Sequence, residues 1–598
     1  MTATLDLWPI GNCQVSALVD RNGRFVWGCV PRVDGDPAFS SLLDAAPRAA
    51  EGARGFWEID LEDCVDTAQH YLDNTPILVT RHTDRDGNAV EVIDFCPRFR
   101  RSGRTYRPVA FARIVRPVIG SPRIRVRLRP ARDWGASDAA TTRGSNHIRY
   151  LLADTVLRLS TTAPIGWIEH ERLFRVERPL HFFLGPDESF ADDIRVAVET
   201  MLDRTAQEWR EWVRGLATPL EWQEAVIRSA ITLKLCQHEE TGAIVAALTT
   251  SIPEHAGSQR NWDYRYCWIR DAYYTVQALN RLGALDVLET YLEYLRNIVD
   301  NARGGHIQPL YGVGGEAHIE EREAPGLSGY RGMGPVRVGN QAYAQIQHDA
   351  YGQIVLSNTQ SFFDQRLFRM GGISDFEALE AIGDRAWEVH DKPDAGLWEL
   401  RTKSNVHTYS VAMCWAACDR LANAAAKLGL AERAAFWQDR ADRIRVRIEQ
   451  SAWREDTSRL SATFGGDDLD ASLIQLLDLR FLPPDDPRFR GTLLAVEEGL
   501  RRGSHMLRYA TEDDFGLPET AFNVCTFWLI EALHATGRIA DARELFEEML
   551  SRRTAAGLLS EDIDPLTGEL WGNYPQTYSL VGMINCAVLL SRPWSSIR

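Results

Sequence analysis

Four segments of the chain combine carboxylate, guanidinium and aromatic side chains. The densest, residues 261–271, holds four aromatic and four charged residues in eleven positions. There the faces of Tyr264 and Trp268 can contact a sugar ring, and Arg270 and Asp271 can hold neighbouring hydroxyl groups as donor and acceptor. The alternative is the start of an amphipathic helix, with Asp271 interacting with the helix dipole. So many polar and aromatic groups are hard to bury as plain core, which favours a binding cleft.

Two glutamates stand in the loops of two further segments. Glu399 ends the sequence Gly-Leu-Trp-Glu, and Glu561 ends Leu-Leu-Ser-Glu. Either glutamate alone is typical of a helix cap or a solvated charge. Together they match the carboxylate pair of glycoside hydrolysis, in which an acid protonates the leaving oxygen and a base activates water; inversion needs a separation of roughly 6.5–9.5 Å. The fourth segment, residues 508–514, begins with Arg508 and has a surface ion-pair loop as its alternative.

The first part of the chain has the pattern of a β-rich domain. Short apolar runs alternate with turn sequences, as in residues 15–27, where Arg-Asn-Gly separates two strand-like segments. Residues 77–93 repeat this pattern, and residues 124–128 alternate apolar and polar side chains. We therefore predict an antiparallel β-sandwich domain over residues 1–191.

The rest of the chain predicts helices. Residues 192–216 carry apolar side chains at helical spacing among charges and are predicted to form a linking helix. Residues 217–598 are predicted to form an all-α catalytic domain, a toroid of paired helices. The clearest helices are expected at residues 272–282, 409–428, 433–450, 526–536 and 540–552. Long loops between them, such as residues 303–340, exceed what helix connections need and are places where sites form.

Composition limits the classes of partner. The chain has 598 residues and a formal charge of −16, from 67 Lys and Arg against 83 Asp and Glu. This acidic balance argues against nonspecific nucleic-acid binding. The N-terminus lacks the pattern of a secretory signal, and no run reaches the ~18 apolar residues of a membrane span. The ten cysteines are scattered and no metal-ligand cluster is visible. We expect a cytoplasmic protein without a metal or other cofactor; the sequence leaves its oligomeric state open.

The order of several motifs along the chain resembles glycoside hydrolase family 15, the family of glucoamylases, glucodextranases and bacterial trehalases. The matching motifs are Ile-Gly-Asn at 10–12, Thr-Gly-Ala-Ile-Val-Ala-Ala at 241–247, Thr-Thr-Ser-Ile-Pro-Glu at 249–254, Tyr-Cys-Trp-Ile-Arg-Asp at 266–271, Gln-His-Asp-Ala-Tyr-Gly at 347–352 and Cys-Thr-Phe-Trp at 525–528. The resemblance implies an N-terminal β-sandwich and a barrel of six outer and six inner helices, an (α/α)6 barrel. It implies an inverting, exo-acting hydrolase of α-glucosidic bonds.

Site roles follow from the same resemblance. Glu399 is similar to the family's general acid and Glu561 to its general base. Arg270, Asp271 and Arg508 resemble the groups that hold the terminal glucose, and Tyr264 and Trp268 resemble aromatics near the bond and the water. The expected ligand is a small α-glucoside or oligosaccharide.

Three functions remain open at this point. The leading one is a glucoamylase-like exo-α-glucosidase that releases β-glucose from non-reducing ends. The second is a trehalase, in which the same acid and base act on α,α-trehalose. The third is a carbohydrate-binding protein on an inactive hydrolase scaffold, against which the presence of both glutamates argues. Leu400 and Asp562, which follow the two glutamates, differ from the Glu and Gln of fungal glucoamylases and bear on the substrate more than on the reaction.

Overall fold

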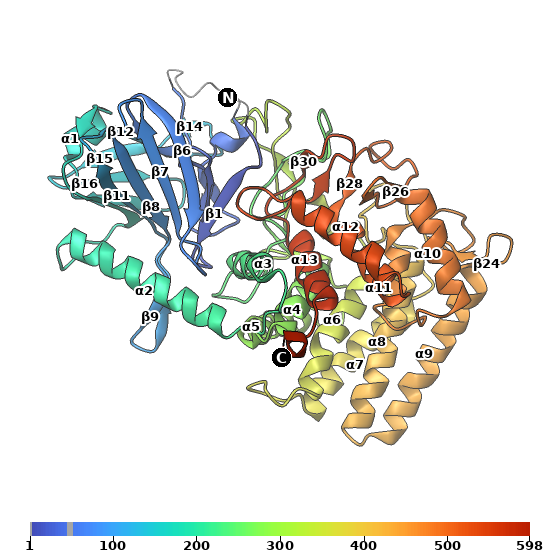
Figure 1. Ribbon diagram of the computed structural model, residues 1–598. Helices are drawn as coiled ribbons and strands as arrows, with labels where there is room; N and C mark the ends of the chain where they lie inside the picture. Colours follow the sequence, from blue (N-terminus) through green and yellow to red (C-terminus); the bar gives the residue numbers. More distant parts are fainter. Residues whose placement is uncertain (1–2, 45–51, 598) are drawn as a thin grey trace.

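The computed structural model describes residues 3–44 and 52–597. Its N-terminal part consists of two large antiparallel sheets (Figure 1). The first has the order β1-β2-β3-β5-β12-β18, with β4 paired to β3, and the second has the order β15-β16-β17-β19-β11-β8-β7-β6. The strands of the first sheet are β1 (Leu7–Gly11), β2 (Ser16–Asp20), β3 (Phe25–Val30), β4 (Asp36–Phe39), β5 (Phe56–Leu61), β12 (Arg123–Arg129) and β18 (Phe174–Arg175). Those of the second are β6 (Cys64–Tyr71), β7 (Leu78–Asp84), β8 (Ala89–Phe95), β11 (Phe111–Ile119), β15 (Ala140–Arg143), β16 (His147–Leu151), β17 (Val156–Thr161) and β19 (Leu180–Pro186).

Aromatic side chains from both sheets form the core of this sandwich. Phe25 of the first sheet lies 6.0 Å from Phe111 of the second, and Trp57 lies 6.4 Å from Phe182, measured between ring centroids. Strand β12 shows the alternation that its sequence predicts, since Ile124, Val126 and Leu128 are buried between exposed or half-buried arginines. The predicted β-sandwich is confirmed.

Helix α2 (Ile194–Arg214) follows the sandwich and lies along its second sheet (Figure 1). Asp193 caps the helix by accepting a hydrogen bond from the backbone N–H of Arg195. The apolar face of α2 buries Val198 and Leu202 against Phe95 and other residues of the second sheet. The division of the chain into 1–191, 192–216 and 217–598 stays a prediction.

The C-terminal part is an (α/α)6 barrel. Its inner ring consists of α4 (Ile269–Arg281), α6 (Asp349–Thr359), α8 (Thr408–Lys427), the 3-10 helix η4 (Ala471–Leu476), α11 (Asn523–Ala535) and α13 (Thr577–Leu590). Each inner element contacts the next, and α13 returns to α4. Around them lie α3 (Gln223–Leu235), α5 (Leu285–Ala302), α7 (Ile373–Val389), α9 (Ala431–Ser451), α10 (Pro487–Leu500) and α12 (Ile539–Ser551). The five helices predicted from the sequence are all present, with ends that shift by three residues or fewer.

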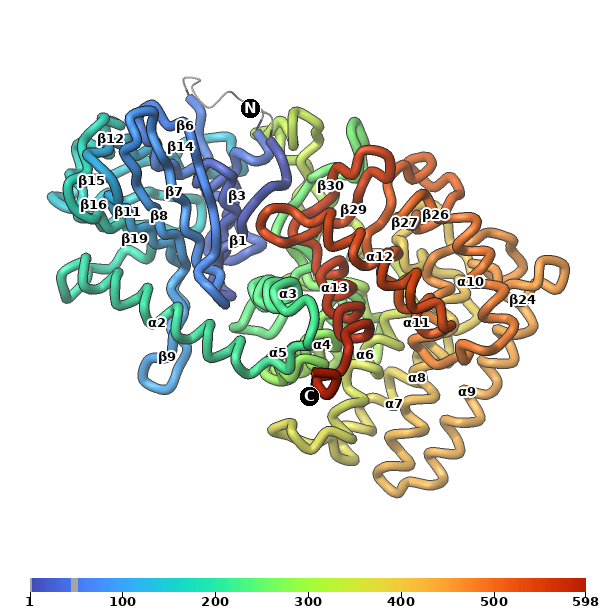
Figure 2. Tube along the Cα trace, viewed as in Figure 1, coloured from blue at the N-terminus to red at the C-terminus, as the bar shows by residue number. Residues whose placement is uncertain are grey.

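The loops that precede the inner elements gather at one end of the barrel. Figure 2 shows part of this end, where β29 (Asp562–Ile563) and β30 (Leu570–Trp571) lie beside the N-terminal sheets. The two domains are joined there by hydrogen bonds: Trp27 Nε1 donates to the carbonyl of Leu248 at 2.7 Å, and the Tyr574 hydroxyl donates to the carbonyl of Leu7 at 2.7 Å. Most residues with candidate chemistry lie in these loops, and Arg270 and Asp271 lie in the first turn of α4.

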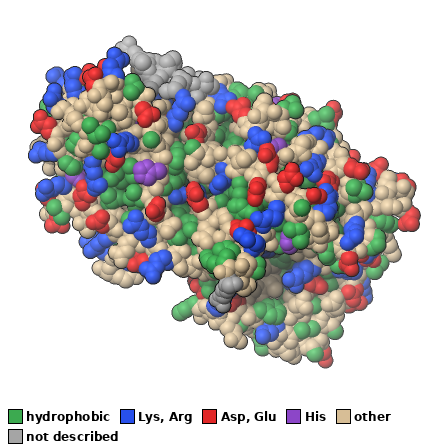
Figure 3. Space-filling view, viewed as in Figure 1, with side chains coloured by type: hydrophobic (Ala, Val, Ile, Leu, Met, Phe, Trp, Pro, Cys, Tyr) green, Lys and Arg blue, Asp and Glu red, His purple; other side chains and the backbone are tan. Residues whose placement is uncertain are grey.

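Acidic and basic side chains are interspersed over the face shown in Figure 3. Among the described residues, no helix combines the length and apolar character needed to cross a membrane. The ten cysteines all lie in the described part of the chain, where each is a free thiol and nine are buried.

Candidate active site

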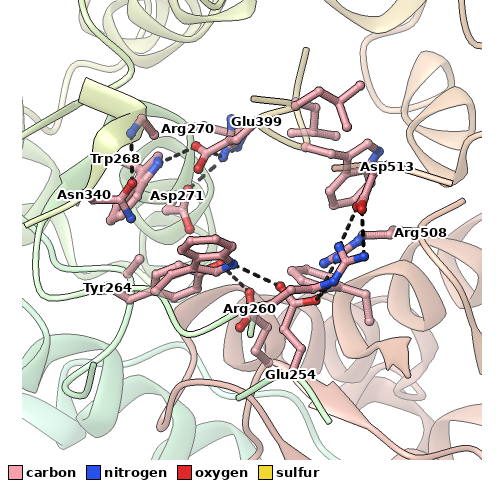
Figure 4. Close-up of a pocket in the computed structure, with 18 of the residues that line it drawn as sticks. Glu254, Arg260, Tyr264, Trp268, Arg270, Asp271, Asn340, Glu399, Arg508 and Asp513 are labelled. Atoms are coloured by element: carbon pink, nitrogen blue, oxygen red, sulfur yellow. Dashed lines mark hydrogen bonds and ion pairs between the residues drawn. The ribbon is translucent and has the colours of Figure 1, made fainter. Parts of the chain in front are cut away.

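A pocket of about 90 Å³ opens at the loop end of the barrel. Figure 4 shows its side chains around a central space, with Trp268, Arg270 and Glu399 on one side and Glu254, Arg508 and Asp513 on another. All seven residues singled out from the sequence line this one pocket: Tyr264, Trp268, Arg270, Asp271, Glu399, Arg508 and Glu561. The structure therefore brings together segments that are far apart in the chain.

The Glu399 carboxylate is surrounded by nitrogen donors. Trp268 Nε1 donates to Oε1 at 2.6 Å, and Arg270 Nη2 and Gln347 Nε2 donate to the same oxygen at 3.3 Å. The side chain keeps 21% exposure, so it faces the open part of the pocket. These donors stabilise a negative charge on Glu399 once a proton has left it.

Glu561 is far more enclosed, with 1% exposure. The Tyr264 hydroxyl donates to Glu561 Oε1 at 2.6 Å. Burial raises the pKa of Glu561, and the nearby carboxylate of Glu254 raises it further. Tyr264 and Trp268 belong to one short segment, and their rings lie 5.4 Å apart. This segment therefore holds both glutamates, each through a different aromatic residue.

Two further carboxylates lie beside Glu561. Glu254, Glu561 and Asp562 are all buried and each offers an oxygen within 4.8 Å of the others. Burial and the two neighbouring carboxylates hold the pKa of Asp562 well above its usual range. These three residues are the group in the described chain that could hold a cation. A positive charge is already there, however, since Arg508 Nη2 donates to Glu254 Oε2 at 2.7 Å.

Polar atoms in the pocket retain unused hydrogen-bonding capacity. Asp271 Oδ2 and Arg508 Nε are buried and have no hydrogen-bond partner among the described residues. Burial raises the pKa of Asp271 to about 7, although Arg270 opposes the shift. An unpartnered buried polar atom costs about 1–3 kcal/mol. A ligand hydroxyl that forms a hydrogen bond with such an atom removes this cost.

Backbone geometry explains how residues 261–271 reach the pocket. Asp263 and Arg265 form a fully buried ion pair, with Arg265 Nη2 2.6 Å from Asp263 Oδ2. Arg265 also donates to the carbonyl of Gly35 at 2.8 Å and lies 4.6 Å from the ring centroid of Trp134. Both contacts come from the N-terminal domain. The side chains between and beyond this pair, Tyr264 and Trp268, are thereby directed into the pocket.

The sequence did not reveal every polar residue of the pocket. Arg260 makes a bidentate ion pair with Asp513 at 2.5 and 2.7 Å, and Glu254 accepts from Arg508. Glu254 ends one of the family-like motifs, and Asp513 lies in the charged segment that begins at Arg508; those were the available signals. Arg260 stands one residue before the aromatic segment and carried no signal of its own.

Comparisons with known proteins agree with this geometry. Residues 222–588 match the model of the family described as glycosyl hydrolases family 15, and residues 7–167 match the model described as trehalase-like, N-terminal. A protein of Thermoplasma volcanium named trehalase is 30% identical over 97% of this chain and 92% of its own length. One of Mycolicibacterium smegmatis with the same name is 32% identical over 98% of this chain and 90% of its own.

The fold also matches a solved structure. A bacterial glucoamylase complexed with acarbose superposes with a TM-score of 0.69, covers 98% of this chain and 94% of its own, and is 14% identical in sequence. At that identity the match concerns the fold alone. The resemblance inferred from the motifs is confirmed by the family model over most of the barrel and by the near full-length relatives. The chain is a glycoside hydrolase and belongs to glycosyl hydrolases family 15.

Proposed function

We propose that the protein is a trehalase that hydrolyses α,α-trehalose with inversion. The support comes from relatives of 30–32% identity over nearly the whole chain that are named trehalase, and from the trehalase-like N-terminal match. The glucoamylase-like exo-α-glucosidase, the leading expectation from the sequence, has only a fold-level likeness in its favour. The relatives therefore favour the second expectation over the first.

The observation that carries the proposal is that Glu399 and Glu561 line one pocket, each held by a different aromatic residue. Glu399 is half-buried among nitrogen donors, whereas Glu561 is enclosed and bonded to Tyr264. We assign Glu399 as the general acid and Glu561 as the general base, as the family-like sequences that carry them imply. Asp271, Arg270 and Arg508 bind the hydroxyl groups of the glucose that is attacked, because two of these three residues have unused polar atoms in the pocket.

The reaction then proceeds in one displacement. Glu399 gives its proton to the oxygen that joins the two sugars as the bond from that oxygen to the attacked anomeric carbon breaks. A water molecule forms the new C–O bond on the opposite face and loses a proton to Glu561. Trp268 Nε1 and Arg270 stabilise the carboxylate that Glu399 becomes. The attacked ring leaves as β-glucose, and the other ring leaves as α-glucose because its own anomeric bond is never broken.

Product analysis tests this proposal directly. Purified protein is offered trehalose, maltose, isomaltose, kojibiose, nigerose, maltotriose, dextran and soluble starch, and products are followed by proton NMR in the first minutes. We expect trehalose to be the preferred substrate and to yield α- and β-glucose in equal amounts before mutarotation. A preference for maltotriose or starch would replace the trehalase assignment by the glucoamylase-like one, and two equivalents of α-glucose would contradict inversion.

Glu254→Gln is expected to move the acidic limb of the pH profile of kcat/KM to lower pH. The base must be ionised, so activity rises with pH through the pKa of Glu561, which burial and then Glu254 raise. Removing the charge of Glu254 removes one of these causes, and the pKa of Glu561 falls. The measurement is kcat/KM against pH for the variant and the wild type.

Glu497→Gln serves as the matched control, because Glu497 also pairs with arginines, Arg501 and Arg538, but does not line the pocket. Its profile is expected to follow that of the wild type. An acidic limb that stays in place, or moves to higher pH, in Glu254→Gln would contradict the electrostatic coupling of Glu254 to the base.

A further inference from the structure

The loop that carries Glu399 is tied to the loop that carries Arg508 through one carboxylate, that of Asp514. The backbone N–H of Arg401 donates to Asp514 Oδ2 at 2.5 Å, and the backbone N–H of Thr402 donates to Oδ1 at 3.1 Å. The Thr402 hydroxyl donates to Oδ1 as well. Three donors from two consecutive residues thus meet on a side chain more than a hundred positions away in the sequence.

Glu399 has a backbone conformation that needs such support. Its φ is 62°, in the left-handed region that a residue with a Cβ atom rarely adopts. Strained backbone of this kind persists where its surroundings hold it, and it occurs often at functional sites. The carbonyl of Glu399 accepts from Gln345 Nε2 at 3.1 Å, and its own N–H donates to the carbonyl of Gly396 at 3.2 Å. Directly after Glu399, the N–H of Leu400 donates to the carbonyl of Ala395 at 3.2 Å, and the two amides held by Asp514 follow.

The side chain of Arg401 does not take part in the contact with Asp514. Its guanidinium donates to Glu321 at 2.8 Å and lies 4.3 Å from the ring centroid of Trp262. Asp514 is bonded to the backbone of Arg401 and not to its charge. The contact is therefore insensitive to which side chain stands at position 401 and fixes the course of the chain itself.

We propose that Asp514 is a positioning residue for Glu399: by holding the amides of residues 401 and 402, it keeps the backbone of Glu399 left-handed and its carboxyl group directed at the leaving oxygen. The proposal rests on the assignment of Glu399 as the general acid. Glu561 depends on a different loop, so loss of the tie should affect protonation of the leaving group and spare activation of water.

That separation can be measured with two substrates. Hydrolysis of trehalose needs a proton on the leaving sugar, whereas α-glucosyl fluoride loses fluoride, which departs as an anion with little help from an acid. For Asp514→Ala we expect kcat on trehalose to fall by about 10²-fold, the scale of a small misplacement of a catalytic group, with KM little changed. On α-glucosyl fluoride we expect kcat to stay within a few-fold of the wild type. Asp514→Asn, whose amide oxygen still accepts one N–H, should fall between.

Asp84→Ala is the matched control. Asp84 also accepts two backbone N–H groups and one side-chain donor, from Asp86 and Asn88, but in a turn of the N-terminal domain. It should leave both substrates unaffected, and thermal unfolding of each variant reports on the fold. Equal losses of Asp514→Ala on both substrates, or full activity on trehalose, would overturn the proposal.

Glu399→Gln provides the reference that keeps the two proposals apart. If this variant lacks the difference between the substrates, the acid assignment fails. If it shows the difference and Asp514→Ala does not, only the positioning role fails. Should the wild type prefer another α-glucoside to trehalose, that sugar replaces trehalose in the comparison.

Discussion

Glu399→Gln is expected to lower kcat on trehalose by roughly 10²–10⁴-fold, the usual contribution of a general acid or base. The amide cannot give a proton to the leaving oxygen, yet its oxygen still accepts from Trp268 Nε1, which donates to Glu399 at 2.6 Å. KM should therefore change much less than kcat. The measurement is steady-state glucose release, with ligand-induced quenching of tryptophan fluorescence as the check that sugar still binds.

Glu171→Gln is a suitable comparison for this variant, because Arg129 binds Glu171 through two hydrogen bonds in the N-terminal domain, away from the pocket. It should keep wild-type activity. If Glu399→Gln retained activity within a few-fold of the wild type, Glu399 would not be the acid.

Glu561→Gln should also lose roughly 10²–10⁴-fold in kcat, because no group then takes the proton from the attacking water. Glu561→Ala adds a more specific test. Azide needs no base, so sodium azide should restore turnover of this variant by forming a C–N bond at the anomeric carbon while Glu399 protonates the leaving sugar. The product should be β-glucosyl azide, since attack comes from the face on which Glu561 lies.

The matched variant for azide rescue is Glu399→Gln, in which azide cannot replace the missing proton of the acid on trehalose. No rescue is expected there. Formation of α-glucosyl azide, or equal rescue of both variants, would contradict the assignment of Glu561 as the base.

Much of the site could be predicted from the sequence because it is contiguous. Tyr264 and Trp268 stand four residues apart, and Arg270 and Asp271 follow after Ile269, so one local segment places four side chains on the pocket. Arg260 and Glu254 had to be found in the structure. Their partners, Asp513 and Arg508, stand 253 and 254 positions later in the sequence, and only tertiary packing brings those charges together.

The inner ring of the barrel shows the same limit. The apolar spacing of α8 and α11 identified them as helices, but the fourth inner element is η4, a 3-10 helix of only six residues. Asp470 accepts from the backbone N–H of Ser472 at 2.7 Å and from Trp398 Nε1 at 2.8 Å. The second of these bonds joins distant segments, so this element depends on the loop of Glu399 as well as on its own sequence.

The buried contact of Arg265 with Gly35 and Trp134 bears on how this protein can be recombined with its relatives. Through these two contacts the N-terminal domain supports the segment that holds both glutamates. In a chimera that joins this barrel to the β-domain of a relative, Arg265 would lose these contacts unless the residues around Gly35 and Trp134 are transferred together with residues 261–265. We therefore expect these two surfaces to covary among homologues that have both domains.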